Sequence, residues 1–132
     1  MNTTFTVDTR DIVKCAGIIE RATTMDGLTI RHDYSIYSLA GQDGFIVGGR
    51  APGRIYNLHA GRDTLAQLLH KYVTSSPRFN VPTYVGLWLP QDGTIHFDIV
   101  DIVPNVVHAI DLARERGERA IYDIRNASDI FV

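Results

Sequence analysis

The segment VGGRAPGRIYNLHAGRD, residues 47–63, places glycines, arginines and a histidine directly before an apolar helical pattern. Glycine lets backbone N–H groups approach an anion, and a helix N-terminus adds partial positive charge, so this composition suggests phosphate binding. The segment matches neither Gly-x-x-x-x-Gly-Lys-Ser/Thr nor Gly-x-Gly-x-x-Gly. Pro52 lacks a backbone donor, and Asp63 competes for the helix N–H groups. The patterns therefore favour an exposed arginine- and glycine-rich loop, with an anion-binding contact as the alternative.

Charge is segregated along the chain. Residues 48–90 carry five basic side chains and one acidic side chain, whereas both flanking segments are net acidic and the whole chain has a formal charge of −2. This asymmetry favours a contact surface for a charged partner. The candidate anion- or partner-binding residues are Arg50, Arg54, His59, Arg62, Lys71 and Arg78. Nucleic acid is an alternative ligand, although a pI near 6.2 is unlike that of a dedicated nucleic-acid binder.

Other reactive side chains do not form a recognisable catalytic or metal-binding pattern. His96 and Asp98 share a strand face, and His108 lies one helical turn from Asp111, but a zinc site needs three or four converging ligands. Asp98 and Asp101 are expected on opposite faces of one strand, which is a poor arrangement for acid–base catalysis. We expect no catalytic residue, no metal and no cofactor.

The run VGLWLP, residues 85–90, has apolar side chains at both odd and even positions. A strand of this kind is either buried on both faces or presents one face to a partner. Trp88 is thus either a core residue or an interface residue, and a homodimer is one form such an interface takes.

The length and composition are those of an ordinary globular chain. With 132 residues, of which 45% are hydrophobic and 21% charged, we expect one domain covering residues 1–132. The single cysteine, Cys15, excludes an intramolecular disulfide and falls on an apolar helical stripe, where a buried thiol is expected. The N-terminus lacks the features of a signal peptide, and no apolar run spans a bilayer, so we expect a cytoplasmic protein without a membrane partner.

Hydrophobic periodicity predicts the elements that position these residues. Helices are expected at 10–22, capped by Asp8 or Thr9, from Asp63 as N-cap to 75, and at 105–116 with Gly117 as the C-terminal glycine. Strands are expected at 4–8, within 25–39, at 45–49, at 54–58, at 119–124 and at the C-terminus, with a hairpin of 83–90 and 94–103. The order β-α-β(β)-α-β-β-α-β predicts an α+β fold, with about three helices on one face of a mainly antiparallel sheet. Residues 48–62 form the longest predicted loop.

Several stretches resemble a known family. DGFIVGG, TYVGLWLPQDGTIHFDIVDIV, HAIDLARERGERAIYDI and SDIF are similar, in this order, to a family of small uncharacterised accessory proteins of actinobacteria, their prophages and their phages. The corresponding features are Gly48–Gly49, Leu65–Val73, Gly86–Trp88, Asp98, Ala113–Gly117 and Ala120–Asp123. The segment RAPGRIYNLHAGRD and the helix start PNVVHA depart from the family pattern. The resemblance implies a phage or prophage accessory protein and carries no catalytic motif.

These observations lead to ranked expectations for function. The first is a non-enzymatic phage or prophage accessory protein that binds a macromolecular partner, a host protein in the host cytoplasm. The alternative is nucleic-acid or nucleotide binding through the basic segment 48–78. A small enzyme, in which His59 or His96 meets a carboxylate in a closed pocket, is the third.

Overall fold

A central antiparallel sheet organises the chain. The computed structural model describes residues 7–132, in which three α-helices, one short 3-10 helix and seven strands are found. In chain order these are α1 (Val7–Met25), β1 (Gly27–Ile30), β2 (Phe45–Val47), β3 (Arg54–Asn57), η1 (Leu58–Ala60), α2 (Arg62–Ser75), β4 (Tyr84–Trp88), β5 (Thr94–Val103), α3 (Val106–Arg116), β6 (Ala120–Asp123) and β7 (Ser128–Phe131). The predicted α+β class and the predicted hairpin, here β4 and β5, are confirmed.

The ten-residue strand β5 is the axis of the sheet. The strand order is β1-β4-β5-β2-β6-β7, so β4 pairs with one edge of β5. The other edge is shared, because β2 pairs with residues 101–103 of β5 and β3 pairs with residues 94–97. Residues 45–57 therefore run along β5 as one interrupted strand. The interruption, residues 48–53, is a short excursion from the sheet edge, and the predicted long loop 48–62 also contains β3 and η1.

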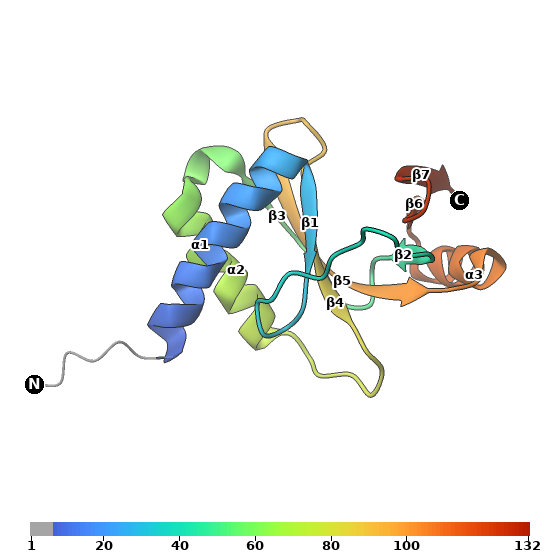
Figure 1. Cartoon of the computed structure of the whole chain (residues 1–132), viewed down its shortest axis with the longest axis horizontal. Helices are drawn as coiled ribbons and strands as arrows, with labels where there is room; N and C mark the ends of the chain where they lie inside the picture. Colours follow the sequence, from blue (N-terminus) through green and yellow to red (C-terminus); the bar gives the residue numbers. More distant parts are fainter. Residues whose placement is uncertain (1–6) are drawn as a thin grey trace, which may run out of the picture.

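Side-chain alternation along β5 explains where the helices pack. Ile95, Phe97 and Ile99 point to one face and are buried in a core formed with α1 and α2. Val103 points to the same face and belongs to a second core under α3. Figure 1 shows α1 and α2 side by side at one end of the sheet and α3 at the other end, beside β2, β6 and β7. All three helices therefore cover one face, as predicted.

The helices bury the stripes that the sequence pattern predicted. In α1 the buried residues include Cys15 and Ile19, and burial raises the pKa of the Cys15 thiol to about 12, with Asp11 adding to the rise. In α3 the side chain of Asn105 accepts from the His108 N–H at 3.1 Å, and Gly117 adopts the left-handed conformation at φ 75°. Within residues 7–132, no helix combines the length and the apolarity needed to cross a membrane.

Two predicted boundaries are wrong. Residues 4–6 of the predicted N-terminal strand lie outside the described residues, but Val7 and Asp8 belong to α1, so Asp8 and Thr9 lie inside a helix instead of capping it. Period-two alternation over five residues is too short a signal to outweigh a helical stripe that continues for several turns. Asp63 is not the N-cap of α2 either: the helix begins at Arg62 after Gly61, and Asp63 sits in its first turn.

Candidate functional site

The glycine-rich excursion binds an anion that belongs to the protein itself. The Gly49 N–H donates to Asp98 Oδ2 at 3.1 Å. A Cβ at Gly48 would overlap the same carboxylate and would also meet Glu118 Oε1 at 2.6 Å, so a larger residue at this position would displace these two acid side chains. Burial raises the pKa of Asp98 to about 6, and the negative charge of Glu118 adds to this rise. The hydrogen bond from the Gly49 N–H acts in the opposite direction and lowers the pKa. The excursion thus holds an internal carboxylate where a phosphate loop would hold a ligand.

Arg50 has a structural role. Its Nε lies 3.0 Å from both carboxylate oxygens of Asp101, and its Nη2 lies 2.9 Å from Oδ1. Arg116 completes the cluster, with Nη2 at 2.6 Å from Asp101 Oδ2 and Nη1 donating to the Gly48 carbonyl at 3.0 Å. Burial alone would raise the pKa of Asp101, but the hydrogen bonds from Arg50 and Arg116 outweigh it and hold that pKa below its usual range. The cluster fixes the excursion against β5 and α3.

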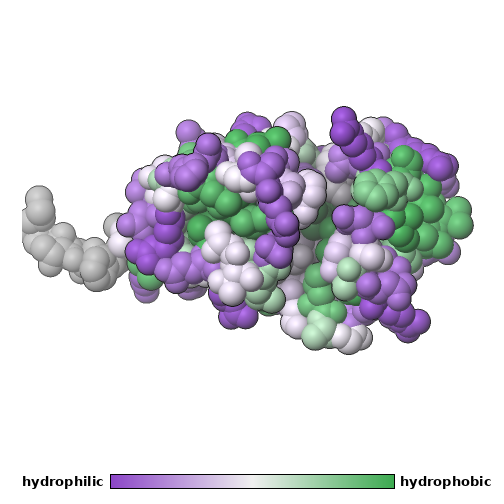
Figure 2. All heavy atoms as spheres, turned by 90° about the horizontal axis from the view of Figure 1, so that it is seen from above, coloured by the Kyte–Doolittle hydropathy of each residue, from purple (hydrophilic) through white to green (hydrophobic). Residues whose placement is uncertain are grey.

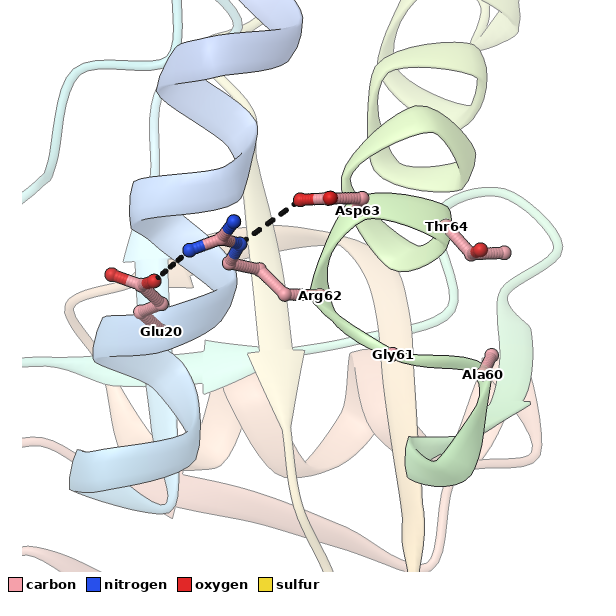
Figure 3. Close-up of a pocket in the computed structure, with 6 residues that line it drawn as sticks. All are labelled: Glu20, Ala60, Gly61, Arg62, Asp63 and Thr64. Atoms are coloured by element: carbon pink, nitrogen blue, oxygen red, sulfur yellow. Dashed lines mark hydrogen bonds and ion pairs between the residues drawn. The ribbon is translucent and has the colours of Figure 1, made fainter.

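Arg62 is also occupied. Its Nη1 lies 2.6 Å from Glu20 Oε1 and its Nε lies 3.0 Å from Asp63 Oδ1. Figure 3 shows Arg62 between these two carboxylates, beside the turn that opens α2. The shallow hollow here, about 500 Å³, is also lined by Ala60, Gly61 and Thr64. Its lining carries two acids and one base, so the hollow does not favour an anion.

Arg54 and Lys71 are the two predicted residues that the fold brings together. They line a groove of about 280 Å³ between β3 and α2. The remaining lining residues are Ala51, Pro52, Tyr56, Leu68, Tyr72, Ser75, Ser76 and Pro77. No carboxylate lines the groove, and within residues 7–132 neither Arg54 nor Lys71 forms an ion pair. We call this feature the cationic groove.

His59 and Arg78 lie outside the cationic groove. His59 is exposed in η1, where its backbone N–H donates to Asn57 Oδ1 at 2.8 Å. Arg78 is exposed beyond α2 and lies near His32, whose pKa is lowered by burial and, to a smaller extent, by the Arg78 charge. Of the six basic candidates, Arg54 and Lys71 are thus the two that line the cationic groove.

The walls of the cationic groove are fixed by internal hydrogen bonds. The Tyr72 hydroxyl donates to the Pro52 carbonyl at 3.1 Å, which ties the excursion to α2, and burial raises the pKa of Tyr72 to about 12. The Ser75 and Ser76 hydroxyls donate to the carbonyls of Lys71 and Tyr72, both at 2.6 Å. The sequence pattern places Tyr72 on the apolar stripe of α2, and its ring is indeed buried, but this spacing does not predict that its hydroxyl bonds to the excursion.

The outer edge of β3 borders the cationic groove. The Leu58 N–H donates to the Gly93 carbonyl at 2.9 Å, and the register places these two residues opposite each other. Hydrogen-bonded and non-hydrogen-bonded pairs alternate in an antiparallel ladder, so Tyr56 and Arg54 also bond toward β5. Ile55 consequently directs its N–H and C=O away from β5. In the described part of the chain β3 pairs with no strand other than β5, so this edge is open.

Trp88 is an exposed residue, so of its two predicted locations the core is excluded and an interface stays a prediction. It points to the sheet face opposite the helices, is 54% exposed, and packs against His96 with ring centroids 5.0 Å apart. His96 on β5 lies opposite Trp88 on one side and opposite Ile55 on the other. The Ile55 side chain is 62% exposed. Ile55, His96 and Trp88 therefore form one row across β3, β5 and β4, which we call the Trp88 row.

A second apolar area lies at the other end of the molecule. Figure 2 shows hydrophobic surface at the end that Figure 1 assigns to α3, β6 and β7. Val107 in α3 and Phe131 in β7 are exposed, the latter by 81%. This area is separate from the cationic groove, which lies between β3 and α2.

No protein-family model, curated protein or solved structure matches the chain. Within residues 7–132, no group of three or more His, Cys, Asp or Glu side chains is placed to hold a metal ion. The fold and the site define an α+β protein with an open strand edge, flanked by a cationic groove on one face and an apolar row on the other.

Proposed function

We propose that the chain is a non-enzymatic phage or prophage accessory protein that binds a host protein along the outer edge of β3. The phage setting is supported by the family resemblance in the sequence. The mode of binding is supported by one observation, the outward N–H and C=O of Ile55 beside the cationic groove. A sheet edge with unpaired backbone groups accepts an extended segment of another chain as an additional strand.

The two faces beside this edge differ in chemistry. Arg54 and Tyr56 point toward α2, whereas Ile55 points to the opposite face, where it is part of the Trp88 row. A strand added to β3 would bring its alternate side chains to these two faces. Backbone hydrogen bonds would then provide affinity, and the two faces would provide selectivity.

The nucleic-acid alternative has less support. A nucleic-acid surface gains affinity by neutralising several phosphates with basic side chains that lie together. Arg50 and Arg62, two of the basic candidates, are already paired with carboxylates. The cationic groove retains Arg54 and Lys71, which suits a short anionic segment better than a long polyanion.

Selection from a library of random displayed peptides tests the proposed function. The matched variants are Ile55→Pro and Ile55→Thr. Proline removes an N–H that points away from β5, so no ladder bond within the protein is lost, whereas threonine keeps this N–H and also shortens the apolar side chain. We expect peptides selected on the wild type to bind Ile55→Thr and to lose binding to Ile55→Pro. Failure to enrich any peptide, or equal binding to both variants, would contradict strand addition at β3.

A further inference from the structure

We infer that the segment bound at β3 is an extended peptide with a carboxylate side chain at every second residue and an apolar side chain at the positions between. This inference rests on the proposed function and specifies the chemistry of the partner. It comes from the charges of the cationic groove, the alternation of β3 and the position of the Trp88 row.

The charges of the cationic groove select an anion. Two cations line it, and no lining residue carries a negative charge. Arg50, the neighbouring arginine in the excursion, is held by Asp101, whose carboxylate also pairs with Arg116. A carboxylate entering the groove would therefore meet Arg54 and Lys71, because the nearby acid Asp98 lies behind the wall, where its charge acts on Tyr72, and is not part of the lining. Unlike charges placed this way favour one partner over another.

The neutral donors of the groove are already in use. The Tyr72 hydroxyl donates to Pro52, and the Ser75 and Ser76 hydroxyls donate to helix carbonyls. A phosphate group is usually bound by several converging N–H or O–H donors together with cations. Two flexible cations beside an open strand edge fit carboxylates carried on an extended backbone better.

The alternation of β3 sets the spacing of these carboxylates. Residues directly opposite each other in an antiparallel pair point to the same face. Side chains of the added strand that share a face with Arg54 and Tyr56 would enter the cationic groove. The side chains between them would lie next to Ile55 and extend the Trp88 row by one strand. An apolar residue at those positions would cover Ile55, which is exposed in the free protein.

The size of the groove agrees with side chains as its occupants. Its volume of about 280 Å³ lies at the lower limit of pockets that enclose whole small molecules, roughly 300–1,000 Å³. A pair of carboxylate side chains from one strand needs less space than such a ligand, and the strand itself would lie outside, along β3.

Capped six-residue peptides test the inference. The probes are an alternating glutamate–valine peptide, its glutamine–valine and lysine–valine counterparts, and a peptide with three glutamates followed by three valines. Dissociation constants are measured by calorimetry for the wild type, Arg54→Gln, Lys71→Gln and the control Arg114→Gln, which removes an exposed charge on α3. We expect the alternating glutamate peptide to bind tightest, and each groove substitution to weaken it by about threefold to fivefold. The same substitutions should leave the dissociation constant of the glutamine–valine peptide unchanged.

The outcomes separate this inference from the proposed function. If the glutamine–valine or block peptide binds as tightly as the alternating glutamate peptide, and binding is lost in Ile55→Pro, strand addition stands and the acidic alternation is wrong. Equal effects of Arg54→Gln and Arg114→Gln would also overturn it. If no peptide loses binding in Ile55→Pro, both proposals fail. Tighter binding of a single-stranded DNA oligonucleotide, weakened by Arg54→Gln, would replace the peptide with nucleic acid.

Discussion

Arg50 Nη2 lies 2.9 Å from Asp101 Oδ1, so an arginine from the most basic stretch of the sequence is held by an acid on β5. Arg116 approaches the other oxygen of the same carboxylate. Asp101 is buried on the helix-covered face, between residues of the two hydrophobic cores. One carboxylate therefore joins the excursion 48–53, the central strand and α3, which keeps the groove-forming segment in place.

Replacing Asp101 should cost more stability than replacing Arg50. Asp101→Asn leaves the guanidinium of Arg116, which is nearly buried, without its charged partner, and we expect a loss of about 2–3 kcal/mol. Arg50→Gln removes a side chain that is 27% exposed and leaves the Arg116–Asp101 pair intact, so we expect about 1 kcal/mol. Urea unfolding measures both free energies of unfolding. Equal losses would contradict the central position given to Asp101.

Asp98 should make stability depend on pH between about 4 and 6.5. Its pKa in the folded protein, about 6, lies above the ordinary value of 3.8, so folding favours the protonated acid. Its contribution to stability is complete below the ordinary pKa and is lost as the pH rises through 6. Because the carboxyl is partly exposed, we expect a change of about 1–2 kcal/mol.

The substitution Asp98→Asn isolates this effect. Between pH 4.5 and 7.5 the wild type should lose stability relative to Asp98→Asn, because the variant has no carboxyl group at this position to ionise. Asp101→Asn is the matched control: the pKa of Asp101 is lowered, so its contribution is lost only below the window and the difference stays constant within it. A constant difference for Asp98→Asn as well would show that the Asp98 pKa is not raised.

Much of the fold follows from local patterns in the sequence. The apolar stripe of α2, the hairpin of β4 and β5, and Gly117 at the end of α3 are signals within a few residues of one another, and all are confirmed. Such signals report local backbone preference and the burial of one face. They predicted the helices and the sheet but not the pairing of β2 and β3 along one edge of β5.

The candidate site was harder to predict because it depends on distant contacts. Arg50, Arg54 and Arg62 are alike in sequence, yet Arg50 meets an acid 51 positions away and Arg62 meets one 42 positions away. Arg54 and Lys71 come together only because β3 and α2 form the walls of one groove. The outward direction of Ile55 depends in turn on strand order and register, which no local pattern encodes.

Gly48→Ala should destabilise the protein. The added Cβ would overlap the Asp98 carboxylate, which accepts from the Gly49 N–H, and would also contact the Glu118 side chain. To relieve this overlap, the Asp98 side chain must move and lose its hydrogen bond to the Gly49 N–H. We therefore expect the free energy of unfolding to fall by about 1–3 kcal/mol. Gly17→Ala in α1 is the control, because a Cβ there meets no atom within 4 Å and alanine favours a helix. Thermal unfolding compares the two variants, and a loss no larger for Gly48→Ala than for Gly17→Ala would be evidence against the close contact.

Trp88→Ala should have little effect on stability. The indole is about half exposed, so we expect a loss below about 1 kcal/mol, whereas Phe97→Ala on the adjacent strand removes a fully buried ring and should cost about 3–5 kcal/mol. Denaturant unfolding measures both. A loss for Trp88→Ala close to that of Phe97→Ala would mean that Trp88 belongs to the core after all.

Strand addition at β3 is tested most directly by hydrogen exchange of the Ile55 amide, followed by NMR with and without the alternating glutamate–valine peptide. The Ile55 N–H points away from β5 in the free protein and should exchange rapidly, whereas the Tyr56 N–H bonds toward β5 and should be protected throughout. Saturating peptide is predicted to slow exchange at Ile55 at least tenfold, with little change at Tyr56. Unchanged exchange at Ile55 with the peptide bound would contradict strand addition.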